Sequence, residues 1–248
     1  MRRMYQRNWL GIEFKDFSKL SKKIIASPKF YNEFYTRLFQ KYQDYESLPI
    51  EWRLGKRAIA DWLLVRINID DRILSVGCGI GYIEQCIWKD SEGRLRLHVW
   101  ELAANSLRWL KNVLPSNNVH ECNDLSSLGK FDVIYLSAVD YALDDSALVS
   151  LISSAMGSLN FGGRIIIISA SFVDDSRISA VIYRLKHIFR LLMSNVGFYQ
   201  FELGQFWGYS RAKSDYIKIM QCAELSKLKD GFIKNGYQNY YWIEATLD

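Results

Sequence analysis

Short runs of apolar residues alternate along the middle of the chain with stretches in which apolar residues recur at helical spacing. Between residues 51 and 66, for example, Leu54, Ala58, Trp62 and Val65 fall on one helical face. This alternation predicts a mainly parallel sheet with helices on both faces, and such sheets bind ligands at the carboxyl ends of their strands. The apolar runs are residues 73–76, 95–100, 119–122, 131–137 and 164–169.

The C-terminal part of the chain has the pattern of a hairpin. Asn235 and Gly236 separate two β-prone runs, at residues 231–233 and 240–245, and an Asn-Gly pair in this position is a strong turn signal. A helix over residues 214–223 is predicted to lead into the hairpin. The sheet is therefore expected to end in an antiparallel pair of strands.

The first apolar run leads into three closely spaced glycines, Gly77, Gly79 and Gly81. Glycine lets the chain turn sharply and removes side chains that would hold a bound group away from the following helix. The spacing is G-x-G-x-G followed by Tyr82, so the dinucleotide fingerprint G-x-G-x-x-G is not met. About twenty residues further on, the second run ends in Glu101, where a doubly wound fold places the acid that binds ribose hydroxyls.

Together with Asp124, which follows the third run, these features resemble those of the class I S-adenosylmethionine-dependent methyltransferases. The resemblance covers roughly residues 50–175, and the C-terminal end more loosely. It implies a Rossmann-like, doubly wound α/β fold with a mainly parallel seven-stranded sheet and an antiparallel last strand. It also implies an enzyme whose cofactor is S-adenosylmethionine.

The resemblance assigns cofactor contacts to particular positions of this chain. The glycine loop lies under the methionine and ribose parts, an acid and its neighbour hold the ribose, two residues after the third strand contact the adenine, and Ser137 ends the fourth strand beside the methyl group. The carboxylate of the cofactor falls to an arginine of the preceding helix, for which a surface salt bridge is the alternative role. The loop residues are Gly77, Cys78, Gly79 and Gly81, the ribose contacts are Glu101 and Leu102, and the adenine contacts are Asp124 and Leu125. Ser137 is the residue beside the methyl group, and Arg53 or Arg57 is the arginine for the carboxylate.

The chain departs from the family's pattern at two positions. The family often has an acid two residues before the first glycine, where this chain has Ser75. It also often has a histidine shortly after the fourth strand, where this chain has Ala142. The first departure leaves the cofactor's placement less defined, and the second removes one candidate base.

Two segments exceed what the methyltransferase fold needs. Residues 1–50 are expected to form an N-terminal helical cap, and residues 51–248 the methyltransferase domain, with a cap insertion at about 172–213. With only 3 Pro and no Ser/Gly-rich stretch, the chain has no flexible linker, so both segments should pack on the sheet. Both are rich in aromatic residues, which mostly serve as packing and in part suit the wall of an acceptor site.

Methyl transfer requires an aligned acceptor and the exclusion of water, and a hydroxyl acceptor also requires a base. The loop after the fourth strand supplies Asp140 and Tyr141 as catalytic candidates, although an aspartate here also suits a helix cap. His187 in the insertion is a further candidate base. Candidate acceptor contacts are Trp207, Tyr209 and Arg211, which combine aromatic rings with a guanidinium.

The acceptor class follows from what the chain lacks. A net charge of +5, from 32 Lys and Arg against 27 Asp and Glu, does not describe a nucleic-acid coat, and the Pro-Pro motif of nucleic-acid N-methyltransferases is absent. We expect a small-molecule or glycan acceptor, with O-methylation of a sugar hydroxyl in polysaccharide or natural-product biosynthesis as the leading case. The alternatives are a protein or peptide methyltransferase and a non-catalytic, methyltransferase-like scaffold; the glycine spacing disfavours a nicotinamide oxidoreductase.

Cysteine usage and hydropathy bear on the compartment. The 4 Cys show no metal spacing and no disulfide framework, no apolar run approaches the roughly 20 residues that span a bilayer, and the N-terminus lacks a signal-peptide pattern. A cytoplasmic protein without a metal site is expected. Basic residues concentrated in residues 1–29 and an amphipathic basic run at 182–193 suit contact with a membrane surface or a partner protein, or else a solvated face.

Overall fold

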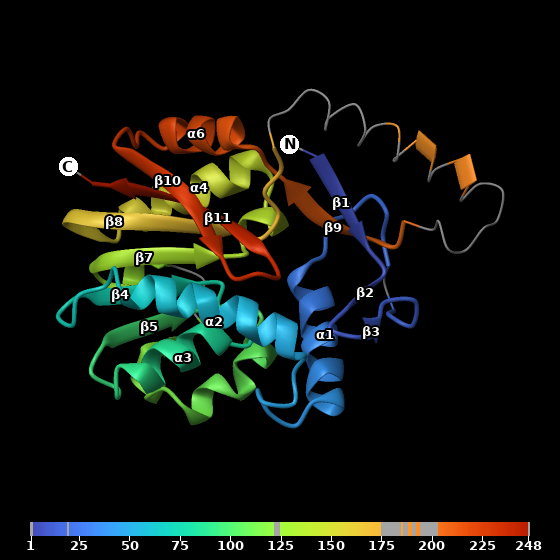
Figure 1. The fold of residues 1–248 in the computed structure, drawn as a ribbon, viewed down its shortest axis with the longest axis horizontal. Coiled ribbons are helices and arrows are strands. Elements are labelled where there is room, and N and C mark those ends of the chain that lie inside the picture. The colour runs from blue at the N-terminus through green and yellow to red at the C-terminus, as the bar shows by residue number, and fades with distance from the viewer. Residues whose placement is uncertain are drawn as a thin grey trace.

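The computed structural model describes residues 2–18, 20–121, 125–174, 185, 188–189, 192–193 and 203–247. Its centre is a seven-stranded sheet in the order β10-β11-β8-β7-β4-β5-β6 (Figure 1). β11 runs antiparallel to both of its neighbours, and the pairs from β8 to β6 are parallel. The strands are β4 (Arg72–Val76), β5 (Arg96–Trp100), β6 (Val119–His120), β7 (Phe131–Ser137), β8 (Leu159–Ser169), β10 (Leu228–Lys234) and β11 (Asn239–Thr246).

This sheet confirms the predicted fold class, a doubly wound, mainly parallel sheet with an antiparallel last strand. The strand expected over residues 131–137 has those bounds. The predicted hairpin is β10 and β11, and its turn is held by the Asn235 side chain, which accepts hydrogen bonds from the backbone N–H groups of Tyr237 and Gln238. Central strands are buried on both faces, which explains why their sequences are continuously apolar.

Helices cover both faces of the sheet (Figure 1). One buried cluster joins α4 and α6 to β7, β8 and β11, and the other joins α2 and α3 to the opposite face. The helices are α1 (Pro28–Lys41), α2 (Ile50–Leu64), α3 (Tyr82–Asp90), α4 (Asp145–Met156) and α6 (Lys213–Cys222). Short 3-10 turns connect them: η1 (Ala104–Arg108), η2 (Leu110–Asn112), η3 (Ser116–Asn118), η4 (Leu125–Leu128) and η5 (Asp140–Ala142).

Capping residues fix where two of these helices begin. Ser27 precedes α1 and accepts a hydrogen bond from the N–H of Phe30, with Pro28 in the first turn. Asp144 precedes α4 and accepts one from the N–H of Ala147 at 2.8 Å. The start of α4 matters for the site because the loop between β7 and α4 lies at the carboxyl end of the sheet.

The N-terminal segment is not the purely helical cap expected from the sequence. Besides α1 it contains the strands β1 (Arg2–Gln6), β2 (Asn8–Trp9) and β3 (Ile12–Glu13). β1 pairs antiparallel with β9 (Gln205–Ser210), so the two extra segments of the chain lie side by side (Figure 1). Strand pairing between opposite ends of a chain leaves no local sequence signal, which is why the pattern did not show it.

Aromatic rings fill the space between this β1–β9 pair and α1. Phe14 is wholly buried, stacks on Trp207 with centroids 5.3 Å apart, and meets Phe30 edge-on at 5.1 Å. Trp9 stacks on Phe34 at 4.7 Å. The aromatic residues of the two extra segments thus serve mainly as the core of one cap, which lies beside the carboxyl ends of the strands.

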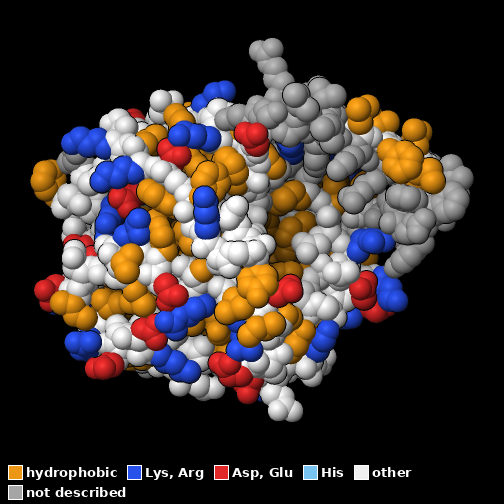
Figure 2. All heavy atoms as spheres, viewed as in Figure 1, with side chains coloured by type: hydrophobic (Ala, Val, Ile, Leu, Met, Phe, Trp, Pro, Cys, Tyr) orange, Lys and Arg blue, Asp and Glu red, His pale blue; other side chains and the backbone are white. Residues whose placement is uncertain are grey.

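Figure 2 shows a hollow with hydrophobic side chains on its walls, near the middle of the face in view. In the described ranges, no helix has the length and hydropathy to cross a membrane, and no group of three His, Cys, Asp or Glu side chains is placed to hold a metal ion. The amphipathic run at 182–193 lies mostly outside the described residues. Of its apolar members, Leu185, Ile188, Phe189 and Leu192 are described and exposed.

Gly208 lies where the cap touches the sheet domain, and its replacement tests this contact. Its φ is +155°, and a Cβ there would lie 2.1 Å from the carbonyl oxygen of Tyr141. Gly208→Ala should therefore lower the free energy of unfolding by more than the roughly 1–3 kcal/mol of backbone strain alone. Gly236→Ala is the matched control, since φ there is +82° and nothing lies within 4 Å. Urea unfolding measures both, and equal losses would contradict the contact.

Candidate functional site

The glycine loop between β4 and α3 is a turn in which no other residue type fits. Gly77, Gly79 and Gly81 have φ values of +70°, +59° and +74°, which L side chains rarely adopt. A Cβ on Gly77 would lie 2.5 Å from Val139, and one on Gly81 would lie 2.4 Å from Leu110. The backbone of the loop is therefore bare and packed close to its neighbours.

Glu101 holds this loop from the neighbouring strand. Val76 and Trp100 are paired at the ends of parallel strands β4 and β5, so the next residue of β5 lies beside the loop. The Glu101 carboxylate accepts hydrogen bonds from the N–H of Gly79 through Oε2 and of Ala103 through Oε1, both at 2.8 Å. Burial raises the pKa of Glu101, and these backbone hydrogen bonds oppose the rise.

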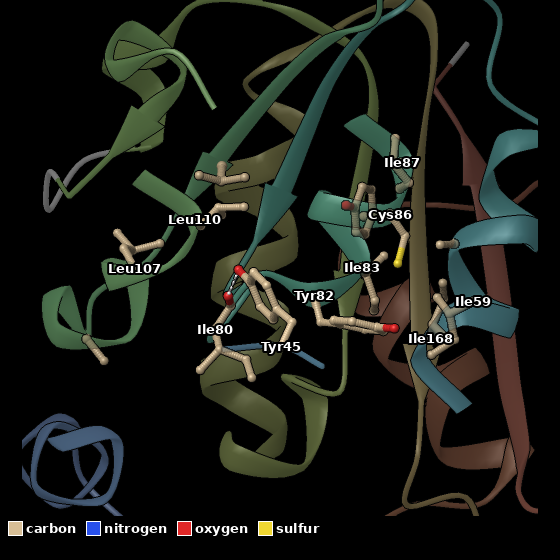
Figure 3. Close-up of a cluster of buried hydrophobic side chains, with 14 of the residues drawn as sticks. Tyr45, Ile59, Ile80, Tyr82, Ile83, Cys86, Ile87, Leu107, Leu110 and Ile168 are labelled. Atoms are coloured by element: carbon tan, nitrogen blue, oxygen red, sulfur yellow. Dashed lines mark hydrogen bonds between the residues drawn. The ribbon is translucent and has the colours of Figure 1, made fainter. Parts of the chain in front are cut away.

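The far end of the loop is held by the segment between α1 and α2. The hydroxyl of Tyr45 donates a 2.5 Å hydrogen bond to the carbonyl oxygen of Ile80, as Figure 3 shows. Tyr45 also packs against the rings of Tyr82 and Trp109, at 5.5 and 5.0 Å between centroids. Both ends of the loop are thus fixed by residues from other elements.

Two adjoining cavities open at the glycine loop. The first has a volume of about 320 Å³ and the second about 280 Å³. Both are lined by Tyr35, Gly77, Ala138 and Tyr141. A single elongated ligand can therefore reach both cavities across the loop.

The first cavity lies between the loop, the cap and the β10–β11 turn, and its wall is mainly apolar. Its polar side chains include Lys56, Glu84, Ser137 and Gln238. The Ser137 hydroxyl is buried and has no hydrogen-bond partner among the described residues. Its aromatic members are Trp9, Tyr35, Trp52, Tyr82, Tyr141, Trp207 and Tyr240.

The second cavity lies between α1 and the loops that follow β5 and β7. Glu101 is the one charged side chain among its described lining residues. The rest of the wall is apolar and includes Leu102, Val139, Leu143 and Leu151. This slot suits a flat apolar group that carries hydroxyls next to one acid.

Tyr141 stands where the two cavities meet. Its ring stacks on Trp207 with centroids 5.8 Å apart and planes 13° apart, and its hydroxyl accepts a 3.2 Å hydrogen bond from Tyr31. Burial raises the pKa of Tyr141. The hydroxyl is therefore protonated at neutral pH and acts as a hydrogen-bonding group at the junction.

The candidate base Asp140 lines neither of the two cavities. Asp140 is wholly buried, and its Oδ2 accepts hydrogen bonds from the hydroxyls of Tyr216 at 2.5 Å and Ser169 at 2.8 Å. Burial raises its pKa, against the effect of these hydrogen bonds and of the nearby Arg211 charge. These hydrogen bonds tie Asp140, and with it the β7–α4 loop, to β8 and α6.

Arg211, a predicted acceptor contact, also lines neither cavity. It is wholly buried, bonds to Asp145 at 2.9 Å and donates to the carbonyl oxygens of Asp140 and Leu143. Tyr209 lies in β9 and lines neither cavity, whereas Trp207 of the same strand lines the first. Only Trp207 of the three predicted acceptor contacts is at the site.

Of the remaining predicted residues, some line a cavity, some do not, and two lie outside the described part of the chain. Arg53 lines neither cavity and is paired with Glu46 and the carbonyl of Leu48, and Arg57 forms ion pairs with Asp61 and Asp90. Leu125 is buried beyond the second cavity's lining. Asp124 and His187 lie outside the described residues. Cys78 and Leu102 line the first and the second cavity.

Glu84 is a site residue that the sequence did not reveal. It lies in the first turn of α3, is 1% exposed, and accepts hydrogen bonds at Oε1 from Ser75 at 2.6 Å and Tyr135 at 2.7 Å. Burial raises its pKa, while both hydroxyls and the charge of Lys56 lower it. An acid in a short amphipathic helix is typical of a surface residue, so only tertiary packing shows this position.

Lys56 of α2 is the second missed residue. Its ammonium group lies 5.9 Å from the ring centre of Trp52 and 6.0 Å from that of Tyr240. Burial lowers the pKa of Lys56 to about 8, and the charges of Glu84 and Asp140 act in the opposite direction. The sequence drew attention to Arg53 and Arg57 on this helix, but the face turned to the cavity is that of Lys56.

Solved structures of other proteins share this architecture. Magnesium protoporphyrin IX methyltransferase from Synechocystis PCC 6803, with bound S-adenosylhomocysteine, is 15% identical with a TM-score of 0.60, covering 89% of this chain and 97% of that one. Human N-acetylserotonin methyltransferase in complex with S-adenosylmethionine is 18% identical with a TM-score of 0.55, covering 96% of this chain and 60% of that one. A putative O-methyltransferase from Nostoc punctiforme is 13% identical with a TM-score of 0.56, covering 93% and 64%.

These likenesses define the fold of the chain as that of the class I S-adenosylmethionine-dependent methyltransferases. The strand order with its antiparallel β11 and the glycine loop after β4 agree with that class. No protein-family model matches the sequence, and no curated protein matches it either. The similarity is thus one of structure, and at these sequence identities it shows the fold.

The depressed pKa of Lys56 predicts a particular dependence of stability on pH. The unfolded chain binds a proton at this position up to about pH 10.5, whereas the folded protein releases it near pH 8. Stability rises with pH wherever the unfolded state binds more protons, so the free energy of unfolding should rise across this interval. Lys56→Met should remove this rise, and the exposed Lys89→Met should keep it. Urea unfolding between about pH 7.5 and 10.5, an interval that spans the folded and unfolded pKa values of Lys56, measures the free energy of unfolding of each variant.

Proposed function

We propose that this protein is an S-adenosylmethionine-dependent methyltransferase that acts on an oxygen atom of a small molecule. The observation that carries the proposal is the bare glycine loop, held by the Glu101 carboxylate, at the junction of two cavities. The fold supports it, and structural neighbours with that fold are described as holding S-adenosylmethionine or S-adenosylhomocysteine.

The residues present fit this cofactor. The second cavity offers an apolar slot for the adenine, formed by Val139, Leu143 and Leu151. The Glu101 carboxylate, with about four acceptor sites, keeps room for the ribose hydroxyls beside its bonds to Gly79 and Ala103. Gly77 and Gly79, which carry no side chains of their own, line the first cavity, towards which the chain of the methionine would pass.

The cofactor, when bound, supplies a methyl group on a sulfonium that is already a good leaving group. The protein's task is then to align the acceptor and to exclude water. The stacked rings of Tyr141 and Trp207 form a rigid wall at the junction, and the Tyr141 hydroxyl and Ser137 Oγ are hydrogen-bonding groups beside it. Asp140 and Arg211 hold the loop that carries Tyr141.

The wall of the first cavity favours a flat, largely apolar acceptor that carries an acidic hydroxyl or a carboxyl group. Its lining is mostly aromatic, and aromatic faces stack on planar ligands. Asp140 lines neither cavity, so the described lining has no aspartate from the β7–α4 loop that could take a proton from the acceptor. An acceptor whose hydroxyl or carboxyl group ionises readily does not need such a base. The named substrates of the neighbours above, a porphyrin and N-acetylserotonin, are planar aromatic molecules.

A sugar hydroxyl is the second candidate acceptor. Gln6, Ser171 and Gln238 give the first cavity hydrogen-bonding side chains next to the indole rings of Trp52 and Trp207, which is the combination that binds a sugar ring. Transfer of a radiolabelled methyl group to hydroxylated aromatic acids and to sugars, tested in parallel, separates the two. Transfer to a peptide only would support the protein-methyltransferase alternative, and binding of the cofactor without transfer the scaffold.

Calorimetric titration with S-adenosylhomocysteine tests the cofactor assignment. We expect micromolar binding by the wild type and no binding of NAD. Glu101→Ala should weaken binding about a hundredfold or more, because hydrogen bonds to a charged group each contribute about 1.5–3 kcal/mol. The exposed Glu92→Ala, on the turn after α3, should bind like the wild type. Absence of binding by the wild type would refute the proposal.

A further inference from the structure

Glu84, which lines the first cavity, has a buried carboxylate oxygen without a partner. Its Oε1 is engaged by Ser75 and Tyr135, but its Oε2 is buried with no hydrogen-bond partner among the described residues. An unsatisfied buried oxygen of a charged group costs stability, so its retention points to a ligand group that donates to it. Because the carboxylate is an acceptor only, the complementary group is a donor, and a cation satisfies it best.

Lys56 brings the opposite charge to the same cavity. In the described part of the chain its ammonium has no hydrogen bond and no ion pair, and it lies over the faces of Trp52 and Tyr240. Glu84 is near enough for each charge to shift the other's pKa, yet the two do not form an ion pair. The lining of the first cavity therefore includes an unpaired cation and an acid whose carboxylate has an oxygen without a partner.

The position of Glu84 is related to the departure at Ser75. The end of β4 carries no acid, and the Ser75 hydroxyl instead donates to the Glu84 carboxylate. The hydroxyl of Tyr135, on the neighbouring strand β7, does the same. The negative charge beneath the glycine loop thus comes from the helix that follows the loop, oriented by two strands.

We infer that Glu84 and Lys56 form a charge clamp for the α-amino acid end of the cofactor, Glu84 taking its ammonium and Lys56 its carboxylate. This inference rests on the proposed function. An α-amino acid carries both charges on one carbon atom, whereas an adenosine carries neither. The second cavity has Glu101 as its one charged lining residue, so within the described residues the pair of opposite charges is found on the other side of the loop.

The experiment measures the affinity of purified protein for four ligands by calorimetry. They are S-adenosylhomocysteine, its analogue without the α-amino group, its analogue without the carboxylate, and 5′-methylthioadenosine, which lacks the whole amino acid. The variants are Glu84→Gln and Lys56→Met. The controls are Glu51→Gln and Lys89→Met, which change exposed residues of the same helices, α2 and α3.

The clamp predicts a crossed pattern of losses. Glu84→Gln should weaken S-adenosylhomocysteine and the analogue that keeps the amine by about tenfold to a hundredfold, and leave the other two ligands unchanged. Lys56→Met should weaken S-adenosylhomocysteine and the analogue that keeps the carboxylate by a similar factor, and leave the amine-only analogue and methylthioadenosine unchanged. The controls should bind all four ligands like the wild type.

The outcomes separate this inference from the proposed function. Failure of the wild type to bind S-adenosylhomocysteine refutes the proposed function itself. If the wild type binds but the variants lose affinity for all four ligands equally, or for none, the cofactor assignment stands and the clamp is refuted. Thermal unfolding shows whether each variant is folded; should Glu84→Gln not fold, the Lys56→Met series decides by the same criterion, since Lys56 has no hydrogen bond in the described structure to lose.

Discussion

The carboxylate of Glu101 binds two backbone N–H groups, of Gly79 and Ala103, and this pair of hydrogen bonds is the constraint on which the site depends. It joins the ends of β4 and β5 and fixes a loop whose three glycines, all at positive φ, add no side chains to the backbone. A bare backbone at a fixed position lets a ligand approach closely, and it leaves the acid itself within reach of ligand hydroxyls. The two cavities on either side follow from this arrangement.

The cap determines what the cavities accept. It consists of strand β1 from one end of the chain paired with β9 from near the other, and the aromatic rings between them and α1 include Trp207. Trp207 stacks on Tyr141, which is carried by a loop that Asp140 and Arg211 hold from below. Tyr141 therefore contacts both the polar network and the aromatic core. The position of the cap thus affects the shape of the acceptor wall.

The sequence predicted those parts of the molecule that have a local signature. The strand at residues 131–137, the Asn-Gly hairpin and the Glu101 spacing depend on short-range patterns, and the structure contains all three. It did not predict the pairing of β1 with β9, because nothing local specifies a partner so distant in the chain. Asp140 was assigned to catalysis and Glu84 was passed over for one shared reason. Burial and hydrogen-bond partners decide the role of an acid, and both come from residues far away in the sequence.

A crystal structure of the protein with S-adenosylhomocysteine would show where the cofactor binds. We expect one bound molecule across the glycine loop, with its ribose hydroxyls on the Glu101 carboxylate and its adenine in the slot formed by Val139, Leu143 and Leu151. Density for the ligand elsewhere on the protein, with the loop and both cavities empty under saturating ligand, would contradict it.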